Sequence, residues 1–385
     1  MAAKFLSLLA ALVVSSTVGI CQPGRATRQP VLPQRMQVMM DSAAHQTYNY
    51  RFDDALMTAD SMISAYPDLP QGYIYKCGIY SKMLVEECFD SPDSVWQEYK
   101  KTVDIACKLS RKELKVNPDN VEGLFDYAGA LVYRSRYEAN GSDWLGLLSD
   151  GVKSRKVLEK AIELDPDFYD AYSGIGAFNY YAAHLPWYLK PVALILGISG
   201  NEREGITQLE KAARFGNYSK VEAASFLAEI VYTNKKEYDE VAKLTLELHD
   251  RYPGNLSFVR TLCHACYKLH DYAEVIRYAD RSFARYPASD SGRFLSLAYI
   301  RFYRGESYAA LKVNYNLAIS DYSKAIEMGQ PSILMTRAYY GRGSLYERLG
   351  MERKAITDFE SVLRLNGDDN ACKQARVALD SLKGE

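Results

Sequence analysis

The chain has 385 residues, of which 48% are hydrophobic and 25% are charged, and its formal net charge at pH 7 is −1. This is an ordinary globular composition, with enough apolar residues for one large core or a long stack of small ones. The 47 basic side chains are balanced by 48 acidic ones, so charge gives no reason to expect a nucleic-acid partner. Tyrosine is unusually frequent, with 31 residues, and its apolar ring with a polar tip suits both helix-packing seams and binding surfaces.

Residues 1–19 have the pattern of a signal peptide. Lys4 supplies the positive charge that precedes the apolar segment. Residues 5–14 are almost wholly apolar, which is the length of a signal core and too short to span a bilayer. The small residues Thr17 and Gly19 predict cleavage after Gly19. The sequence therefore predicts an exported protein of the periplasm or the outer membrane.

Residues 20–34 contain proline and arginine without a helical period, which predicts a flexible leader before the folded part. Within the leader, Cys21 raises the question of a lipid anchor. Ile20 stands where a lipoprotein signal has Gly, Ala or Ser, and this argues against lipidation. The other six cysteines are irregularly spaced, which is typical of small buried residues on helix seams rather than of a disulfide framework.

Short proline-containing segments recur along the chain. RYPGN at 251–255 returns as RYPAS at 285–289, so that Pro253 and Pro287 lie 34 residues apart. Each such segment follows a helical stretch, because proline cannot continue a helix and a neighbouring Asp or Asn can cap the next one. Related segments are SAYPD at 64–68, KVNPD at 115–119 and ELDPD at 163–167. A period of 34 residues with two helices is the signature of the tetratricopeptide repeat.

The sequence resembles the tetratricopeptide (TPR) family over most of residues 36–366. Residues 256–289 and 336–369 are its fullest copies, with small residues at helix crossings and large residues between successive hairpins. Two positions depart from the pattern: Arg342 stands where an apolar residue is usual, and Gly367 replaces the terminal proline. The resemblance implies an all-α fold, a right-handed solenoid of helical hairpins.

We expect about eight hairpins, followed by a helix over residues 370–383 that caps the exposed end of the stack. Together they would make residues 35–385 one solenoid. The expected hairpins span residues 35–66, 70–117, 120–165, 168–216, 219–252, 255–286, 290–329 and 333–366.

Residues 171–216 carry a second resemblance, to the inclusion-body-clearance family of divergent TPR proteins and to exported bacterial relatives. In that family a glycine-bearing helix precedes a Leu-Pro with an apolar turn, and a glycine-rich charged motif opens the next helix. Here the motif consists of Gly200, Asn201, Arg203, Glu204 and Gly205. The similarity extends over about residues 120–330 and implies an adaptor without known chemistry.

Residues 185–200 form an irregular insert within the fourth hairpin, with two prolines and an apolar run. One interpretation is a short helix that folds back over the hairpin and buries Leu194, Ile195 and Leu196, with Asn201 capping the following helix. A shallow membrane contact through Trp187 and Tyr188 is another, and a lid over a ligand is a third. The prolines and the length argue against a membrane span.

Chemistry-bearing motifs are few. Cys263, His264 and Cys266 form a C-x-x-C cluster with a neighbouring histidine, which could bind zinc or act in redox chemistry. Both cysteines, however, occupy packing positions of the repeat, so buried structural residues are the favoured interpretation. We find no phosphate-binding loop and no nucleophile motif. We therefore expect no enzyme, no catalytic residues, no metal and no cofactor.

The first helix of each TPR hairpin lines a concave groove that binds peptides or partner segments. Alignment of the hairpins places an aromatic set there, with arginine towards its C-terminal end; Tyr and Arg dominate interface energetics. An alternative is that about half of the tyrosines pack between hairpins instead. The predicted groove residues are Tyr75, Phe125, Tyr133, Tyr180, Tyr181, Tyr232, Arg260, His264, Tyr267, Tyr299, Tyr303, Arg337 and Tyr340.

The sequence thus predicts a non-enzymatic, exported TPR scaffold that captures a protein or peptide partner by aromatic burial and Arg–carboxylate pairing. Two other functions remain open. The chain could bind a small molecule or glycan for a transport system, or act as a membrane-peripheral adaptor through residues 185–200. The partner and the oligomeric state are left open.

Overall fold

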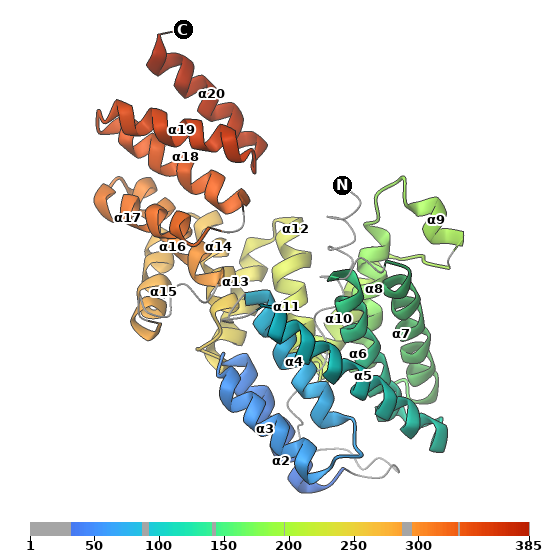
Figure 1. The fold of residues 1–385 in the computed structure, drawn as a ribbon. Helices are drawn as coiled ribbons and strands as arrows, with labels where there is room; N and C mark the ends of the chain where they lie inside the picture. The colour runs from blue at the N-terminus through green and yellow to red at the C-terminus, as the bar shows by residue number, and fades with distance from the viewer. Residues whose placement is uncertain are drawn as a thin grey trace. The chain divides into compact units, whose positions relative to one another are not determined.

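The computed structural model describes residues 32–86, 92–140, 144–195, 197–286, 295–329 and 332–384. The predicted signal peptide 1–19, Cys21 and most of the leader lie outside these ranges, as does Leu196. Throughout the described ranges the chain is helical and forms no strand (Figure 1). The predicted all-α, TPR-like class is confirmed.

The helices follow one another in antiparallel pairs joined by short connections (Figure 1). In chain order the first four pairs are α2 (Gln34–Tyr48) and α3 (Phe52–Ala65), α4 (Gln71–Glu86) and α5 (Pro92–Val116), α6 (Val121–Asn140) and α7 (Trp144–Leu164), and α8 (Ala171–Ala183) and α10 (Glu202–Phe215), with the short α9 (Lys190–Ile195) between the last two.

The later elements continue the pattern. They are α11 (Lys220–Phe226), the π-helical η1 (Leu227–Tyr232), α12 (Thr233–Lys235) and α13 (Tyr238–Arg251), then α14 (Leu256–Lys268) and α15 (Tyr272–Arg285), α16 (Leu295–Leu311) and α17 (Tyr315–Glu327), and α18 (Ser332–Arg348) and α19 (Glu352–Leu365). The final helix is α20 (Asp369–Lys383), which packs on α19. These bounds agree with the eight predicted hairpins and the predicted capping helix.

The contacts divide the chain into two compact units. The first comprises Met1–Val85, Phe89–Lys236 and Asp250–Gly254, and the second Glu86–Cys88, Glu237–His249 and Asn255–Glu385. The division between α12 and α13 falls within the predicted fifth hairpin.

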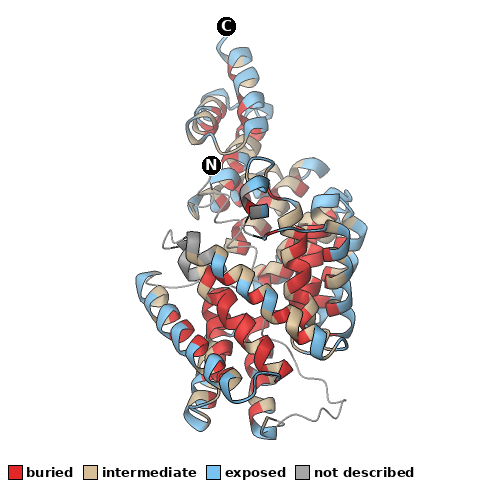
Figure 2. Cartoon of the chain, turned by 90° about the vertical axis from the view of Figure 1, so that its right-hand side faces the viewer, coloured by how far each residue is buried: buried red, intermediate tan, exposed pale blue. Residues whose placement is uncertain are grey.

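Each helix buries one side and exposes the other, so that buried residues run as stripes along the paired helices (Figure 2). In the first unit, one such core joins α4, α5 and α6 around Ile74, Tyr99 and Tyr133. The hydroxyl of Tyr99 donates to the carbonyl of Tyr133 at 2.8 Å, which satisfies a polar group inside this core. Hairpin packing therefore accounts for many of the 31 tyrosines by itself.

In each of three hairpins, an Arg–Asp ion pair joins the two helices. Arg134 pairs with Asp150, Arg304 with Asp321, and Arg342 with Asp358. In the last pair, Nε and Nη2 of Arg342 each lie 2.8 Å from one carboxylate oxygen of Asp358. The side chains are only 17% and 4% exposed. The guanidinium of Arg342 thus neutralises a buried carboxylate on the neighbouring helix. This explains why arginine stands where the repeat pattern has an apolar residue.

Removal of one partner would leave the other charge buried. We expect Arg342→Ala to lower the free energy of unfolding by about 3 kcal/mol. The double variant Arg342→Met with Asp358→Leu should retain most of the stability, because it buries no lone charge. Denaturant unfolding of the variants measures both effects.

The exposed pair Lys243–Glu240, whose atoms lie 4.0 Å apart, offers a matched control. Lys243→Ala should change the free energy of unfolding by less than about 0.5 kcal/mol. Equal effects of Arg342→Ala and Lys243→Ala would contradict a stabilising role of the buried pair.

In the fourth hairpin, α8 and α10 cross at two glycines. A Cβ on Gly205 would lie 2.7 Å from the carbonyl oxygen of Gly176 and 2.7 Å from the amide nitrogen of Tyr180. A Cβ on Gly176 would lie 2.8 Å from the carbonyl oxygen of Gly205. The two backbones therefore touch, and only glycine fits at either position. Asn201 caps α10 by accepting from the amide of Glu204 at 3.2 Å, as predicted.

We expect Gly205→Ala to destabilise the chain by about 1–3 kcal/mol, because the helices must separate to admit the methyl group. Gly151→Ala is the control. Gly151 lies in α7, and nothing lies within 4 Å of the Cβ that would be added there. It should be neutral or stabilise by about 0.5–1 kcal/mol through helix propensity. Similar unfolding midpoints for both variants would argue against a tight crossing.

Candidate functional site

In the second unit, predicted groove residues come together on the first helices of successive hairpins. The guanidinium of Arg260 on α14 lies 5.8 Å from the ring centre of Tyr299 on α16. The imidazole of His264 stacks on Tyr303 with a centroid distance of 5.4 Å. Tyr267 packs against the same Tyr303 ring at 5.8 Å. With Arg337 from α18, these side chains form what we call the aromatic–basic cluster: Arg260, His264, Tyr267, Tyr299, Tyr303 and Arg337.

Helical spacing explains why they meet. Arg260, His264 and Tyr267 are four and three residues apart on α14, so they lie on one helix face. Tyr299 and Tyr303 repeat the four-residue spacing on α16. Most of the cluster is half-buried, whereas the side chain of Arg337 is 50% exposed.

The cluster has a positive electrostatic character. The pKa of His264 is lowered from 6.5 to about 4, mainly by burial and also by the charge of Lys268. Arg260 and Arg337 act on His264 in the same direction, so both guanidinium groups influence this one imidazole. The pKa of Tyr299 is raised by burial and lowered by the same two arginines. At neutral pH the imidazole is therefore uncharged, and the positive charge belongs to the arginines and Lys268.

Carboxylates fix the rim of the cluster. The hydroxyl of Tyr267 donates to Oε2 of Glu306 at 2.8 Å, and that of Tyr322 donates to Oε1 of the same carboxylate at 2.6 Å. Nε of Arg337 lies 2.7 Å from Oδ2 of Asp368. Rings held at fixed angles beside guanidinium groups can bind an apolar or aromatic side chain together with a carboxylate.

His264 makes stability depend on pH in a definite direction. The imidazole takes up its proton near pH 6.5 in the unfolded chain and near pH 4 in the folded one, so the unfolded chain binds more protons between these values. Acidification from pH 7 to about 4.5 therefore removes stability, and His264→Gln should reduce that loss by up to about 2 kcal/mol. The control is His270→Asn at an exposed histidine. An undiminished loss in His264→Gln would exclude this imidazole as the responsible group.

The predicted groove residues of the first unit lie differently. Tyr133 and Tyr180 are each only 2% exposed and belong to the packing between helices. The hydroxyl of Tyr180 accepts from Nδ2 of Asn234 at 3.1 Å, and its ring packs on Phe226. Tyr181 packs on Phe226 as well, with a centroid distance of 5.0 Å. These side chains hold hairpins together instead of facing an open groove.

Two further predicted residues join other contacts. The hydroxyl of Tyr232 donates to Oε1 of Glu210 at 3.3 Å. Tyr340 packs against Phe359 with a centroid distance of 5.9 Å, in the core that α18 and α19 share with α20.

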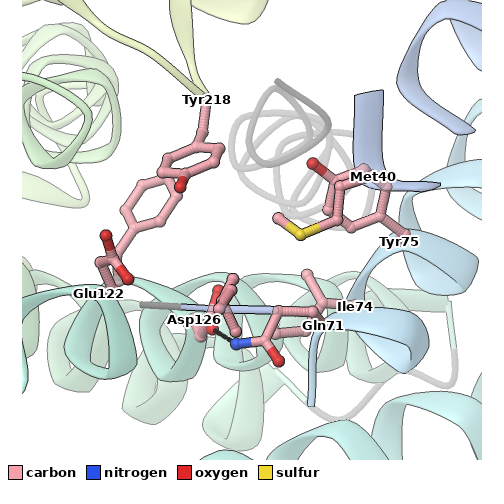
Figure 3. A pocket seen from close by; sticks show the side chains of 9 residues that line it. Met40, Gln71, Ile74, Tyr75, Glu122, Asp126 and Tyr218 are labelled. Atoms are coloured by element: carbon pink, nitrogen blue, oxygen red, sulfur yellow. Dashed lines mark hydrogen bonds between the residues drawn. The ribbon is translucent and has the colours of Figure 1, made fainter. Parts of the chain in front are cut away.

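Tyr75 and Phe125 are buried but line a small pocket of the first unit, with a volume of about 20 Å³ (Figure 3). Met40 and Tyr75 lie on one side of this pocket, and Glu122 and Tyr218 on the other. The remaining lining residues are Leu32, Gln71, Ile74 and Asp126. The volume is sufficient for about one water molecule.

This pocket has an acidic character that was not predicted from the sequence. Glu122 and Asp126 are four residues apart, on the face of α6 that also carries Phe125. Burial raises the pKa of Asp126 well above its usual value, and the charges of Glu113 and Glu122 raise it further. Nε2 of Gln71 donates to its carboxylate at 2.7 Å. The four-residue spacing of Glu122 and Asp126 was the feature of the sequence that could have predicted this acidic pocket.

Tyr218 reaches this pocket because Asp170 holds the loop before α11. The carboxylate of Asp170 accepts from the amides of Asn217 at 3.1 Å, Tyr218 at 2.7 Å and Ser219 at 2.7 Å. A buried carboxylate with these donors ties the start of α8 to the next hairpin.

Residues 185–200 form the predicted short helix, α9, but bury a different set of side chains. Leu194 is 70% exposed, so the expectation that it covers the hairpin is wrong. Leu185, Ala193 and Ile198 are buried in its place. The reason is the helical step of about 100° per residue: Ala193 faces the hairpin, and Leu194 therefore points away from it. Of Ile195 the structure describes the backbone, as the end of α9.

The C-x-x-C cluster is part of the core. Cys263 and Cys266 are buried free thiols, and burial raises the pKa of Cys263 and that of Cys266, the latter to about 11. Thiols of this kind are protonated at neutral pH and are poor metal ligands. Across the described ranges no group of three or more His, Cys, Asp or Glu residues is arranged to hold a metal ion. Nor does any helix there have the length and apolarity needed to cross a membrane.

Comparison with known proteins places these features in context. The family model of the regulator of microtubule dynamics protein 1–3 matches residues 80–253, and that of the tetratricopeptide repeat matches residues 336–369. A search of the curated proteins returned no match. The resemblance to the inclusion-body-clearance family stays a prediction.

Solved structures share the architecture at low sequence identity. A chain in the crystal structure of the APC/C hetero-tetramer Cut9-Hcn1 is 13% identical, with a TM-score of 0.58 over 91% of this chain and 57% of that one. This chain therefore spans a little over half the length of that protein. PilF of Pseudomonas aeruginosa is 14% identical, with a TM-score of 0.45 over 66% of this chain and 99% of its own. Human IFIT1, as a dimer with PPP-AAAA, is 13% identical, with a TM-score of 0.46 over 98% and 85%.

The first of these structural matches supports the fold, and the repeat model identifies its unit. This chain has a tetratricopeptide-like all-α fold, and its residues 336–369 match the tetratricopeptide repeat itself.

Proposed function

We propose that the protein is a non-enzymatic, exported scaffold that captures a segment of a partner protein on the aromatic–basic cluster. The observation that carries this proposal is the placement of Arg260 and Arg337 beside half-buried aromatic rings on consecutive first helices. Tyrosine and arginine are the residues that contribute most to protein interfaces. A TPR-like fold supports a role in protein interaction.

The charge of the cluster selects the chemistry of the partner segment. Because Arg337 is already paired with Asp368, Arg260 and the nearby Lys268 are the groups that favour carboxylates, from Asp or Glu side chains or from a C-terminus. The rings favour an apolar or aromatic side chain next to the carboxylate. We therefore expect an acidic segment with at least one large apolar residue.

Export is the part of the proposal that rests on residues 1–19. We expect the chain in a bacterial host to lose these residues and to be recovered from the periplasm or the outer membrane. N-terminal sequencing of the recovered protein should begin at Ile20. A chain retained whole in the cytoplasm would contradict export while leaving the binding proposal intact.

The binding proposal is tested by affinity capture from detergent-solubilised envelopes, with Arg260→Glu and Tyr299→Ala as the cluster variant. Partners that wild type retains and the variant loses are identified by mass spectrometry. The responsible segment is then made as a synthetic peptide. We expect its affinity to fall by a factor of about ten to a hundred in Arg260→Glu, and to weaken with added salt.

Arg281→Glu provides the matched control, since Arg281 is exposed on α15, a second helix of the same unit. It introduces the same charge change and should leave the affinity unchanged. Equal losses in both variants would indicate only a general effect of charge. If no partner depends on the cluster, retained binding from a panel of carbohydrates or organic acids would favour a small-molecule receptor instead.

A further inference from the structure

The insert at residues 185–200 in the first unit is held firmly at its base. Leu185, Ala193 and Ile198 are buried against side chains of α7 and α8 that include Val152 and Phe178. The amide of Ile198 donates to the carbonyl of Ala193 at 2.7 Å, which closes the turn after α9. The base of the insert is therefore packed into the core of the fourth hairpin.

The neighbouring residues strengthen this attachment. Nη1 of Arg155 on α7 donates to the carbonyl of Ser199 at 3.2 Å. A Cβ on Gly200 would lie 2.4 Å from the carbonyl oxygen of Asn179 and 2.5 Å from the amide nitrogen of Ala183, so the chain returns in direct contact with the backbone of α8. Figure 1 shows α9 on a loop that projects beyond the end of α8.

The outward face of this projection is apolar and aromatic. Trp187 is 82% exposed, Leu194 70% and Tyr188 47%. The rings of Trp187 and Tyr188 meet edge-on, with their centroids 6.0 Å apart. Three large apolar side chains are thus displayed to solvent by a segment whose other side is packed, and hydration of such a face is unfavourable.

Charge distinguishes among possible occupants. Residues 185–200 contain one charged side chain, the exposed Lys190, and no acidic residue. Tryptophan and tyrosine place an apolar ring and a polar edge at the level of lipid headgroups, and lysine beside them meets an anionic headgroup. A projecting segment of this kind meets a broad surface more readily than it encloses a peptide.

We propose that residues 187–194 are a shallow membrane-contact element that seats Trp187, Tyr188 and Leu194 in the interfacial layer of an anionic bilayer, with Lys190 at the headgroups. The six residues of α9 lie on the membrane and do not cross it. This proposal concerns the first unit and is independent of partner binding by the aromatic–basic cluster.

The test uses the full chain with Trp96→Phe and Trp144→Phe, which leaves Trp187 as the single tryptophan. We expect flotation with vesicles of phosphatidylglycerol and phosphatidylethanolamine, together with a blue shift of Trp187 fluorescence on binding. Trp187→Ala with Leu194→Asp should lower the partition coefficient at least tenfold. Because both side chains are largely exposed, circular dichroism and the unfolding midpoint should stay the same.

Lys190→Glu should weaken binding to anionic vesicles, with little change for the weak binding expected to vesicles of phosphatidylcholine alone. Val116→Asp is the matched control, because Val116 is 84% exposed at the end of α5. It should float as wild type does. Arg260→Glu should also float normally, so that failure of the partner proposal and failure of the membrane proposal can be told apart.

Absence of flotation, or equal flotation of wild type and of Trp187→Ala with Leu194→Asp, would overturn the proposal. Sedimentation at increasing concentration tests the other occupant, a second copy of this chain. Wild type could self-associate without binding vesicles, and this self-association could disappear in Trp187→Ala with Leu194→Asp. That result would assign the surface to a contact between two copies of the chain and would refute the membrane proposal.

Discussion

Within each unit, the fold of the described residues depends on the apolar seams that paired helices share. The longer helices of the described ranges, with 13 to 25 residues, bury one side and expose the other, and a single amphipathic helix has little stability alone in water. Antiparallel pairing of neighbours satisfies each buried stripe locally, and further hairpins extend the core without any one large interior. Other contacts between paired helices modify how closely and in which register these apolar seams pack.

The adjustments are of two physical kinds. Where the helices approach most closely, side chains are removed: Gly176 and Gly205 bring two backbones into contact. At other places, long charged side chains connect the two helices of a hairpin. The Arg342–Asp358 pair is of this type, and its equivalents in two other hairpins repeat the same sequence separation to within one residue. A change of partner or register would leave the charges of such a buried ion pair unpaired, and this disfavours other arrangements of the two helices.

Side chains that do not pack between helices are available for contacts with other molecules. In the second unit, the positions left over on α14, α16 and α18 are aromatic and basic, and they sit together. In the first unit, most of the tyrosines predicted to line the groove pack between helices instead. This unit also contains a small acidic pocket. The insert of the fourth hairpin adds a third surface, which is apolar and carries a single positive charge. The cluster, the pocket and the insert thus differ in charge, although they belong to one repeated fold.

The sequence by itself determined the fold, because the 34-residue period, the proline stops and the caps are local signals. Hairpin bounds, the cap of Asn201 and the anomaly of Arg342 were all readable from neighbouring residues. The candidate site was predicted only in part. A tyrosine on a first helix can face either the groove or the adjacent hairpin, and its spacing along the helix is the same in both cases. Only the tertiary structure decided that Tyr180 is core, that Tyr299 belongs to a basic cluster, and that Ala193 rather than Leu194 is buried. Those choices depend on how hairpins rotate against one another, and this rotation is set by packing between residues far apart in the sequence.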